Sequence, residues 1–242
     1  MTIKNVKLFA LAIVLNFPIT NLVTAHELST LPENIQQPTQ LSVNAKTTLM
    51  AKLANLDHFS ANFTQEVLSE SGEVLEQSSG KLAISKPNLA HWQTLAPDEL
   101  SIVSDGTDVW FYNPWIEQVS VYSLSAAIAK TPILLLTSKD ETLWQQYHVT
   151  QQMVTKETVT KTSQNTGDSF VITAKDTNSQ IKSLTLYFYS NEKGGQLKQF
   201  SFLDATGQLS HIKLSDFDAQ HAPKSSLFNF IVPAGVQVDD QR

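Results

Sequence analysis

The sequence predicts a mainly β protein of the α+β class, in which one antiparallel sheet is covered by a few helices. The first observation is a series of short segments with alternating apolar and polar residues, mostly separated by Gly, Pro, Asn or Asp at hairpin-like intervals. The second is that helical periodicity is confined to one early stretch and one Ala- and Leu-rich middle stretch. This order favours an antiparallel meander over βαβ units. Such a sheet can close as a barrel or stay open, and an open sheet needs helices over its inner face.

The N-terminus has the features of a secretory signal peptide over residues 1–25. Lys4 and Lys7 form a basic start, residues 8–15 are an uncharged apolar core, and Val23-Thr24-Ala25 offers small residues to a signal peptidase. The apolar core is too short to span a bilayer as a helix. We therefore expect cleavage near Ala25, which leaves one exported domain over residues 26–242.

A covering helix and a first strand follow a polar lead-in at residues 26–40. Between residues 41 and 56 the apolar residues recur at helical spacing and form one stripe. From Phe59 onward the period changes to two, which is typical of a half-buried strand. The stripe consists of Ala45, Leu49, Leu53 and Leu56.

Further strands are expected in two groups around a helical middle. We predict two or three short helices between residues 123 and 147, one of which begins at Thr131-Pro132 and continues into Ile133–Leu136. The polar stretch 150–167 reads as an exposed hairpin or loop. The predicted strands are 80–85, 90–94, 100–104, 107–112 and 116–122, then 169–174, 183–189, 196–203, 208–217 and a last short one at 227–232.

One predicted strand is apolar on both faces. Asp105-Gly106 is a hairpin turn signal, since Gly accepts a positive φ without a Cβ clash. Val109 to Tyr112 then presents four consecutive large apolar or aromatic side chains, and consecutive side chains of a strand point to opposite faces. Two apolar faces need two covers. One cover can be a ligand, or both faces can be ordinary core.

Composition excludes several classes of function. The net charge is −6, and it becomes −8 without Lys4 and Lys7 (15 basic against 23 acidic side chains), so nucleic-acid binding is not expected. The chain has no cysteine, which removes thiolate metal sites, cysteine nucleophiles and lipidation through an N-terminal cysteine. The histidines show no paired ligand spacing, and the sequence contains neither a Gly-x-Ser-x-Gly elbow nor a metalloprotease helix motif. We expect no enzyme activity, no metal and no cofactor.

Several motifs, taken in order, resemble the periplasmic outer-membrane lipoprotein carrier family (LolA). No single motif is decisive, but their order and spacing together are specific and cover nearly the whole chain after the predicted signal peptide. They comprise residues 59–65, Lys86-Pro87-Asn88-Leu89 with Trp92, residues 104–114, Glu117-Gln118, Thr131-Pro132, residues 144–147 and residues 228–242.

The resemblance implies an unclosed antiparallel β-barrel with an α-helical lid over an apolar cavity. It also implies a periplasmic carrier, acting as a monomer, that takes acylated lipoproteins from an inner-membrane ATP-driven transporter to an outer-membrane receptor. That receptor has a similar fold but is anchored through a lipidated cysteine. Because this chain has no cysteine, it resembles the carrier rather than the receptor.

Strand parity, the apolar middle helix and the resemblance together predict which residues line the cavity. Lys86 occupies the position where the family usually has the Arg that holds the lid shut, and Ala90 replaces the usual aromatic residue. Lysine can donate to carbonyl groups of the lid but lacks the planar fork of arginine, and it can equally be a solvated surface lysine. The predicted acyl-binding residues are Phe63, Val67, Ile84, Trp92, Ile102, Trp110, Leu134 and Leu136.

Two alternatives remain open at this point. One is a related periplasmic carrier of another acylated or glycolipid ligand, which would use the same cavity. The other is a protein-interaction domain that pairs through a sheet edge and has a dry, filled core. Lipid that co-purifies with the protein distinguishes the carriers from the interaction domain.

Overall fold

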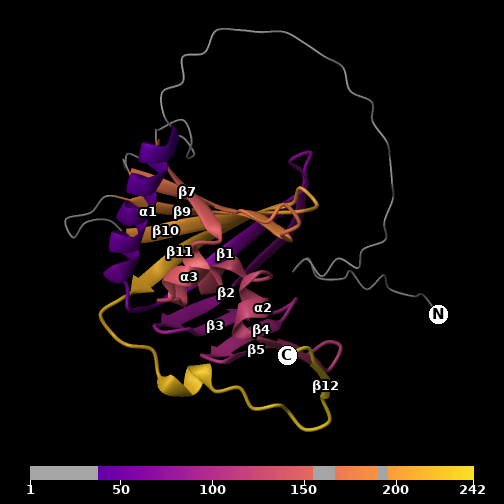
Figure 1. The fold of residues 1–242 in the computed structure, drawn as a ribbon. Coiled ribbons are helices and arrows are strands. Elements are labelled where there is room, and N and C mark those ends of the chain that lie inside the picture. The colour runs from indigo at the N-terminus through magenta and orange to yellow at the C-terminus, as the bar shows by residue number, and fades with distance from the viewer. Residues whose placement is uncertain (1–37, 155–166, 190–195) are drawn as a thin grey trace.

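The fold is described from a computed structural model at residues 38–154, 167–189 and 196–242 (Figure 1). The predicted signal peptide at residues 1–25, most of the predicted lead-in and the Gly194-Gly195 turn lie outside these residues.

The strands of the described residues belong to one sheet, whose order is β12-β6-β5-β4-β3-β2-β1-β11-β10-β9-β8-β7. Two antiparallel meanders, β1 to β6 and β7 to β11, join where β1 pairs with β11. The order ends at β12 and β7, so the sheet stays open, as the resemblance implies. The strands are β1 (His58–Leu68), β2 (Val74–Ser85), β3 (Leu89–Thr94), β4 (Leu100–Asp105), β5 (Asp108–Asn113), β6 (Gln118–Ser123), β7 (Tyr147–Val154), β8 (Gly167–Ala174), β9 (Ile181–Tyr189), β10 (Gln196–Asp204), β11 (Leu209–Asp218) and β12 (Gln237–Asp240).

Short helices lie over the inner, concave face of the sheet (Figure 1). Helix α1 (Pro38–Ala54) contacts β7, and its stripe of Ala45, Leu49 and Leu53 is buried, as predicted. The predicted middle helices are α2 (Leu124–Ile128), the 3₁₀ helix η1 (Pro132–Thr137) and α3 (Glu141–Trp144). Pro132 opens η1 as expected, since its missing N–H needs no partner there.

The last predicted strand differs from the structure. The sequence predicts a strand over residues 227–232, but Ser225–Phe228 forms the 3₁₀ helix η2 and the last strand is β12, which runs parallel to β6. Phe228 is buried in η2 without pairing to a neighbouring strand. The apolar residues of this stretch therefore reflect packing of the side chains and not a strand. The stretch expected to form an exposed hairpin or loop begins within β7, which pairs antiparallel with β8 up to Val154 and Gly167, as the two arms of a hairpin do; residues 155–166 lie outside the described residues.

Strand β5 has two covered apolar faces, as its sequence predicts. Val109 is fully buried in the main core, and Phe111 packs against that core. On the other face, the ring of Phe230 lies 5.6 Å from that of Trp110 and 5.8 Å from that of Tyr112, measured between centroids. Both covers therefore come from the chain itself.

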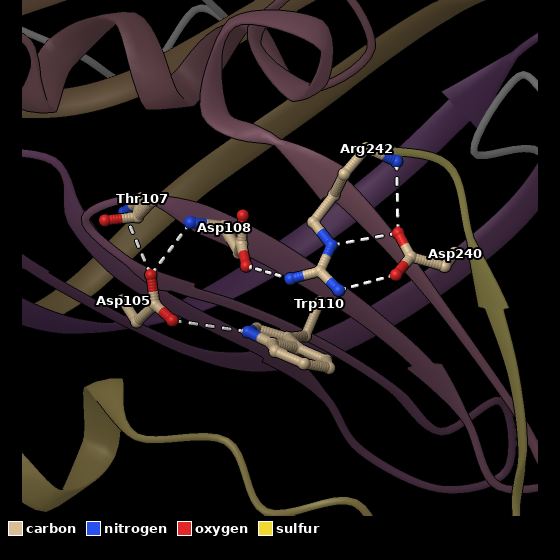
Figure 2. Close-up of polar contacts among 6 residues, drawn as sticks. All are labelled: Asp105, Thr107, Asp108, Trp110, Asp240 and Arg242. Atoms are coloured by element: carbon tan, nitrogen blue, oxygen red, sulfur yellow. Dashed lines mark hydrogen bonds and ion pairs between the residues drawn. The ribbon is translucent and has the colours of Figure 1, made fainter.

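Residues 225–242 form a strap across the outer, convex face of β3 to β6 (Figure 1). The Gln237 N–H donates to Glu117 O at 2.9 Å, and the Gln241 N–H donates to Val121 O at 2.8 Å. Figure 2 shows the Arg242 guanidinium bridging two carboxylates, Asp108 at 2.6 Å and Asp240 at 2.9 Å. The hydrogen bonds from Arg242 lower the pKa of Asp240 to about 2. The strap is thus held by strand pairing and by ion pairs at its end.

Candidate functional site

The concave face is an apolar surface built from alternate residues of neighbouring strands. Cross-strand pairing brings Ile84, Ala90 and Ser104 into one row, and Leu82, Trp92 and Ile102 into the next. At its centre, the Trp92 ring lies 4.0 Å from that of Phe63 and 6.2 Å from that of Phe200, which meets it edge-on. Aromatic rings of this kind bury large areas and dominate such a face energetically.

The 3₁₀ helix η1, called here the lid segment, packs onto this face. Its four apolar residues, Ile133 to Leu136, are between 1% and 5% exposed. A 3₁₀ helix has about three residues per turn, so four consecutive side chains point in all directions around it. All four are buried because the segment lies between the sheet and the other short helices.

One small gap borders the lid segment in the described part of the chain. A gap of about 10 Å³ lies among residues of α2, η1 and strands β7 to β9, which is close to the minimum that one water molecule needs. In this structure the side chains of the lid segment occupy the concave face, so an acyl chain can bind there only if they move.

One turn of the sheet holds both α1 and the lid segment. The Lys86 ammonium donates to the carbonyl oxygen of Leu53, in the last turn of α1, at 2.5 Å. The Asn88 N–H donates to Thr137 O at the end of η1 at 3.1 Å, and the Ser104 hydroxyl donates to Asn88 O at 2.6 Å. Asn88 has a φ of 64°, a left-handed conformation that asparagine tolerates better than most residues. We call residues 86–88 the latch turn.

Lys86 is half-buried in this arrangement. Burial lowers its pKa, an effect opposed by the nearby carboxylate of Asp57 and reinforced by Lys139. Within the described parts of the chain, its hydrogen bond goes to α1 and not to the lid segment. The lid segment is instead bonded to the backbone of Asn88.

The structure brings together six of the eight predicted cavity residues. Phe63, Ile84, Trp92, Ile102, Leu134 and Leu136 belong to one buried cluster. Val67 is buried on the same face of β1 but lies beyond that cluster. Trp110 does not line this space: it lies on the convex face, where it stacks on Phe230, because it has the opposite strand parity to Val109 and Phe111.

Several residues of the site were missed from the sequence. Leu135, Phe170, Leu186 and Phe200 belong to the same buried cluster. The alternation within 183–189 and 196–203 could have identified Leu186 and Phe200. The roles of Asn88 and Ser104 had no sequence signal, because they depend on backbone groups that approach from distant segments.

The described residues offer little for catalysis or metal binding. They contain no group of three or more His, Asp or Glu side chains placed to hold a metal ion. Asp218 and His221 form a pair at 2.8 Å, but the histidine side chain is 83% exposed. Among the described helices, none has the length and apolarity needed to cross a membrane.

The open, mainly antiparallel sheet with a covered apolar concave face places the protein in the class of unclosed, barrel-like β proteins. Residues 54–231 match the family described as outer membrane lipoprotein carrier protein LolA, and the chain belongs to this family. A carrier family is not a family of enzymes.

Curated relatives support this assignment over most of the chain. A protein named outer-membrane lipoprotein carrier protein, from Photobacterium profundum, is 38% identical over 199 residues, which are 82% of this chain and 90% of that protein. A protein of the same name from Aeromonas salmonicida is 34% identical over 84% of this chain and 92% of its own length. A third, from Proteus mirabilis, is 37% identical over 82% of this chain and 90% of its own length.

Proposed function

We propose that this protein is a periplasmic carrier that binds the acyl chains of lipoproteins and delivers them to the outer membrane. The observation that carries the proposal is the apolar concave face covered by the four apolar side chains of the lid segment. The family and the names of the relatives support it independently.

Acyl chains can replace the lid segment on energetic grounds. Exposing four buried aliphatic side chains costs about 6–12 kcal/mol gross, at about 1.5–3 kcal/mol each. Two or three long acyl chains gain roughly 20–40 kcal/mol gross when they leave water, at about 0.8 kcal/mol per CH₂. Replacing the lid segment by acyl chains is therefore favourable. The cost of exposing the lid segment lowers the net affinity for the cargo, so that the cargo can leave again.

The proposed partners follow from this role. An inner-membrane ATP-driven transporter supplies the lipoprotein, since the sequence contains no nucleotide-binding loop, and an outer-membrane receptor accepts it. The carrier acts as a monomer, without a cofactor and without enzyme activity. Removal of residues 1–25 would start the mature chain at His26, and N-terminal sequencing of a periplasmic extract tests this.

The latch turn helps the carrier to release its cargo. Lys86 and Asn88 hold α1 and the lid segment over the concave face, and loading breaks these bonds. They form again only when the cargo leaves, so they raise the free energy of the loaded state relative to the empty state. This favours transfer to the receptor.

Mass spectrometry of material extracted by organic solvent from the exported, purified protein tests the proposal. Lipoprotein or lipopeptide is the expected ligand. Another acylated lipid or a glycolipid would instead indicate a related carrier. The covered concave face also suits a protein-interaction domain with a dry core. That function gains support if no lipid is released from the protein and none binds when it is added.

A further inference from the structure

A groove opens beside the last turn of α1, where β9 and β11 end and β10 begins. Its volume is about 610 Å³, within the range of pockets that bind small ligands. Leu56, Phe188, Leu197 and Phe217 provide its apolar lining. The polar groups come from Lys52, Asn55, Gln196, Asp218, Gln220 and His221.

The apolar lining is continuous with the buried core. Phe188 and Leu197 belong to the same cluster as Trp92 and Leu136. Phe217 packs against that cluster, and its ring stacks on Phe59 with 4.7 Å between centroids. An apolar ligand in the groove would therefore touch the end of the core cluster before any residue of the lid segment moves.

The charged groups of the groove are paired with one another or with their neighbours. Lys52 Nζ lies 3.1 Å from Asp168 Oδ2 and 5.6 Å from the centroid of the Phe188 ring. Asp218 Oδ2 lies 2.8 Å from His221 Nδ1, and hydrogen bonds from the side chain and backbone of His221 and from the Gln220 N–H lower the pKa of Asp218. Lys52 and Asp218 thus already have partners within the protein, and the apolar side chains of the lining are the groups left to bind a ligand, which favours an apolar one.

The groove also adjoins the latch. Lys52, Asn55 and Leu56 border it, and the Leu53 carbonyl within the same turn accepts the hydrogen bond from Lys86. A ligand that pushes this turn outward would break that bond. The groove and the bond from Lys86 thus share the last turn of α1.

We propose that this groove is the first docking site for a fatty acyl chain, occupied while the lid segment still covers the concave face. The chain then displaces the last turn of α1, releases Lys86 and passes onto the concave face. This inference rests on the proposed carrier function and adds a loading route to it.

The test measures how fast the protein takes up a synthetic triacylated lipopeptide with an NBD-labelled acyl chain, supplied in self-quenching detergent micelles. Ala219→Trp places bulk in the groove at an exposed position, away from the concave face. Uptake should become about 10-fold slower or more, as expected when an association route is obstructed, while the final fluorescence stays that of the wild type.

The matched control is Ala222→Trp, because Ala222 is also exposed and lies three residues further along but does not line the groove. It should load at the wild-type rate. Leu56→Asp, which puts an unpaired carboxylate on the lining, should also slow uptake. Wild-type rates for both groove variants would overturn the inference. A wild-type protein that takes up no probe would instead overturn the carrier function.

Discussion

The covers on the two faces of the sheet differ in how they are held. On the concave face, the lid segment contributes four buried aliphatic side chains, and one backbone hydrogen bond, from Asn88 to Thr137, ties its end to the latch turn. On the convex face, the strap pairs β12 with β6, stacks Phe230 on Trp110 and Tyr112, and bridges Asp108 and Asp240 through Arg242 (Figure 2).

This difference indicates which cover can be exchanged. Apolar contacts are non-directional, so an acyl chain can replace the leucines of the lid segment at little loss. An acyl chain has no donor or acceptor and cannot replace the ladder and ion pairs of the strap. We therefore expect ligand binding to displace the concave cover and to leave the convex cover in place.

The largest expected effect comes from a charge on the concave face. Ile102→Glu places an unpaired carboxylate among buried apolar groups, so acyl-chain binding should be abolished. Lipopeptide binding is measured, with circular dichroism to check folding. Thr64→Glu, at an exposed position of β1, is the matched control and should bind normally. A well-folded Ile102→Glu protein with full binding would contradict the assignment of this face.

The latch turn should affect delivery more than loading. Lys86→Leu removes the donor to Leu53 O and should destabilise the empty, covered state by about 0.5–3 kcal/mol. The variant should accept lipoprotein but transfer it poorly from the purified loaded carrier to a receptor. Lys86→Arg retains a donor and should transfer at least as well as the wild type. Equal transfer by wild type and Lys86→Leu would show that Lys86 is an ordinary surface lysine.

The strap should matter for stability and not for binding. Phe230→Ala removes two ring contacts and should lower the free energy of unfolding by about 1–2 kcal/mol, with lipopeptide affinity unchanged. Urea denaturation measures the first quantity. Ile231→Ala is the neighbouring control, since that residue is 77% exposed and its truncation should change stability by less than about 0.5 kcal/mol. A loss of affinity in Phe230→Ala would show that the two covers are coupled.

The smallest expected effect is a pH dependence of stability, caused by a histidine on the convex face. Burial lowers the pKa of His91 below 6.5, and His91 and Leu227 of the strap line one groove. Just below pH 6.5, His91 therefore binds a proton more readily in the unfolded chain than in the folded protein. The contribution of His91 to the free energy of unfolding is fully present above that pH and is lost as the pH falls. His91→Gln should weaken this decrease in thermal melts between neutral and acidic pH. Some decrease should remain, because burial also lowers the pKa of His211. An unchanged decrease in the variant would argue against a contribution from His91.

Local pattern was sufficient to predict much of the sheet. Alternation placed Phe59, Ala61 and Phe63 on the buried side of β1, and Asp105-Gly106 formed the expected turn, with Gly106 at a φ of 100°. The helical stripe of α1 and the Pro132 start of η1 were also readable, because periodicity and turn chemistry are properties of neighbouring residues. The same local pattern could not show that residues 225–228 would form η2 or that the last strand would be parallel.

The sequence by itself determined that β5 would have two apolar faces, because strand parity is local and alternates at every residue. Only the tertiary structure decided which face each side chain would occupy and what would cover it. Trp110 lies on the face opposite to Val109, and Phe230 covers it there after returning from far along the chain. Lys86 reaches the carbonyl of Leu53 because α1 ends beside the latch turn. Contacts of this kind depend on how distant segments pack, and no periodicity of neighbouring residues encodes them.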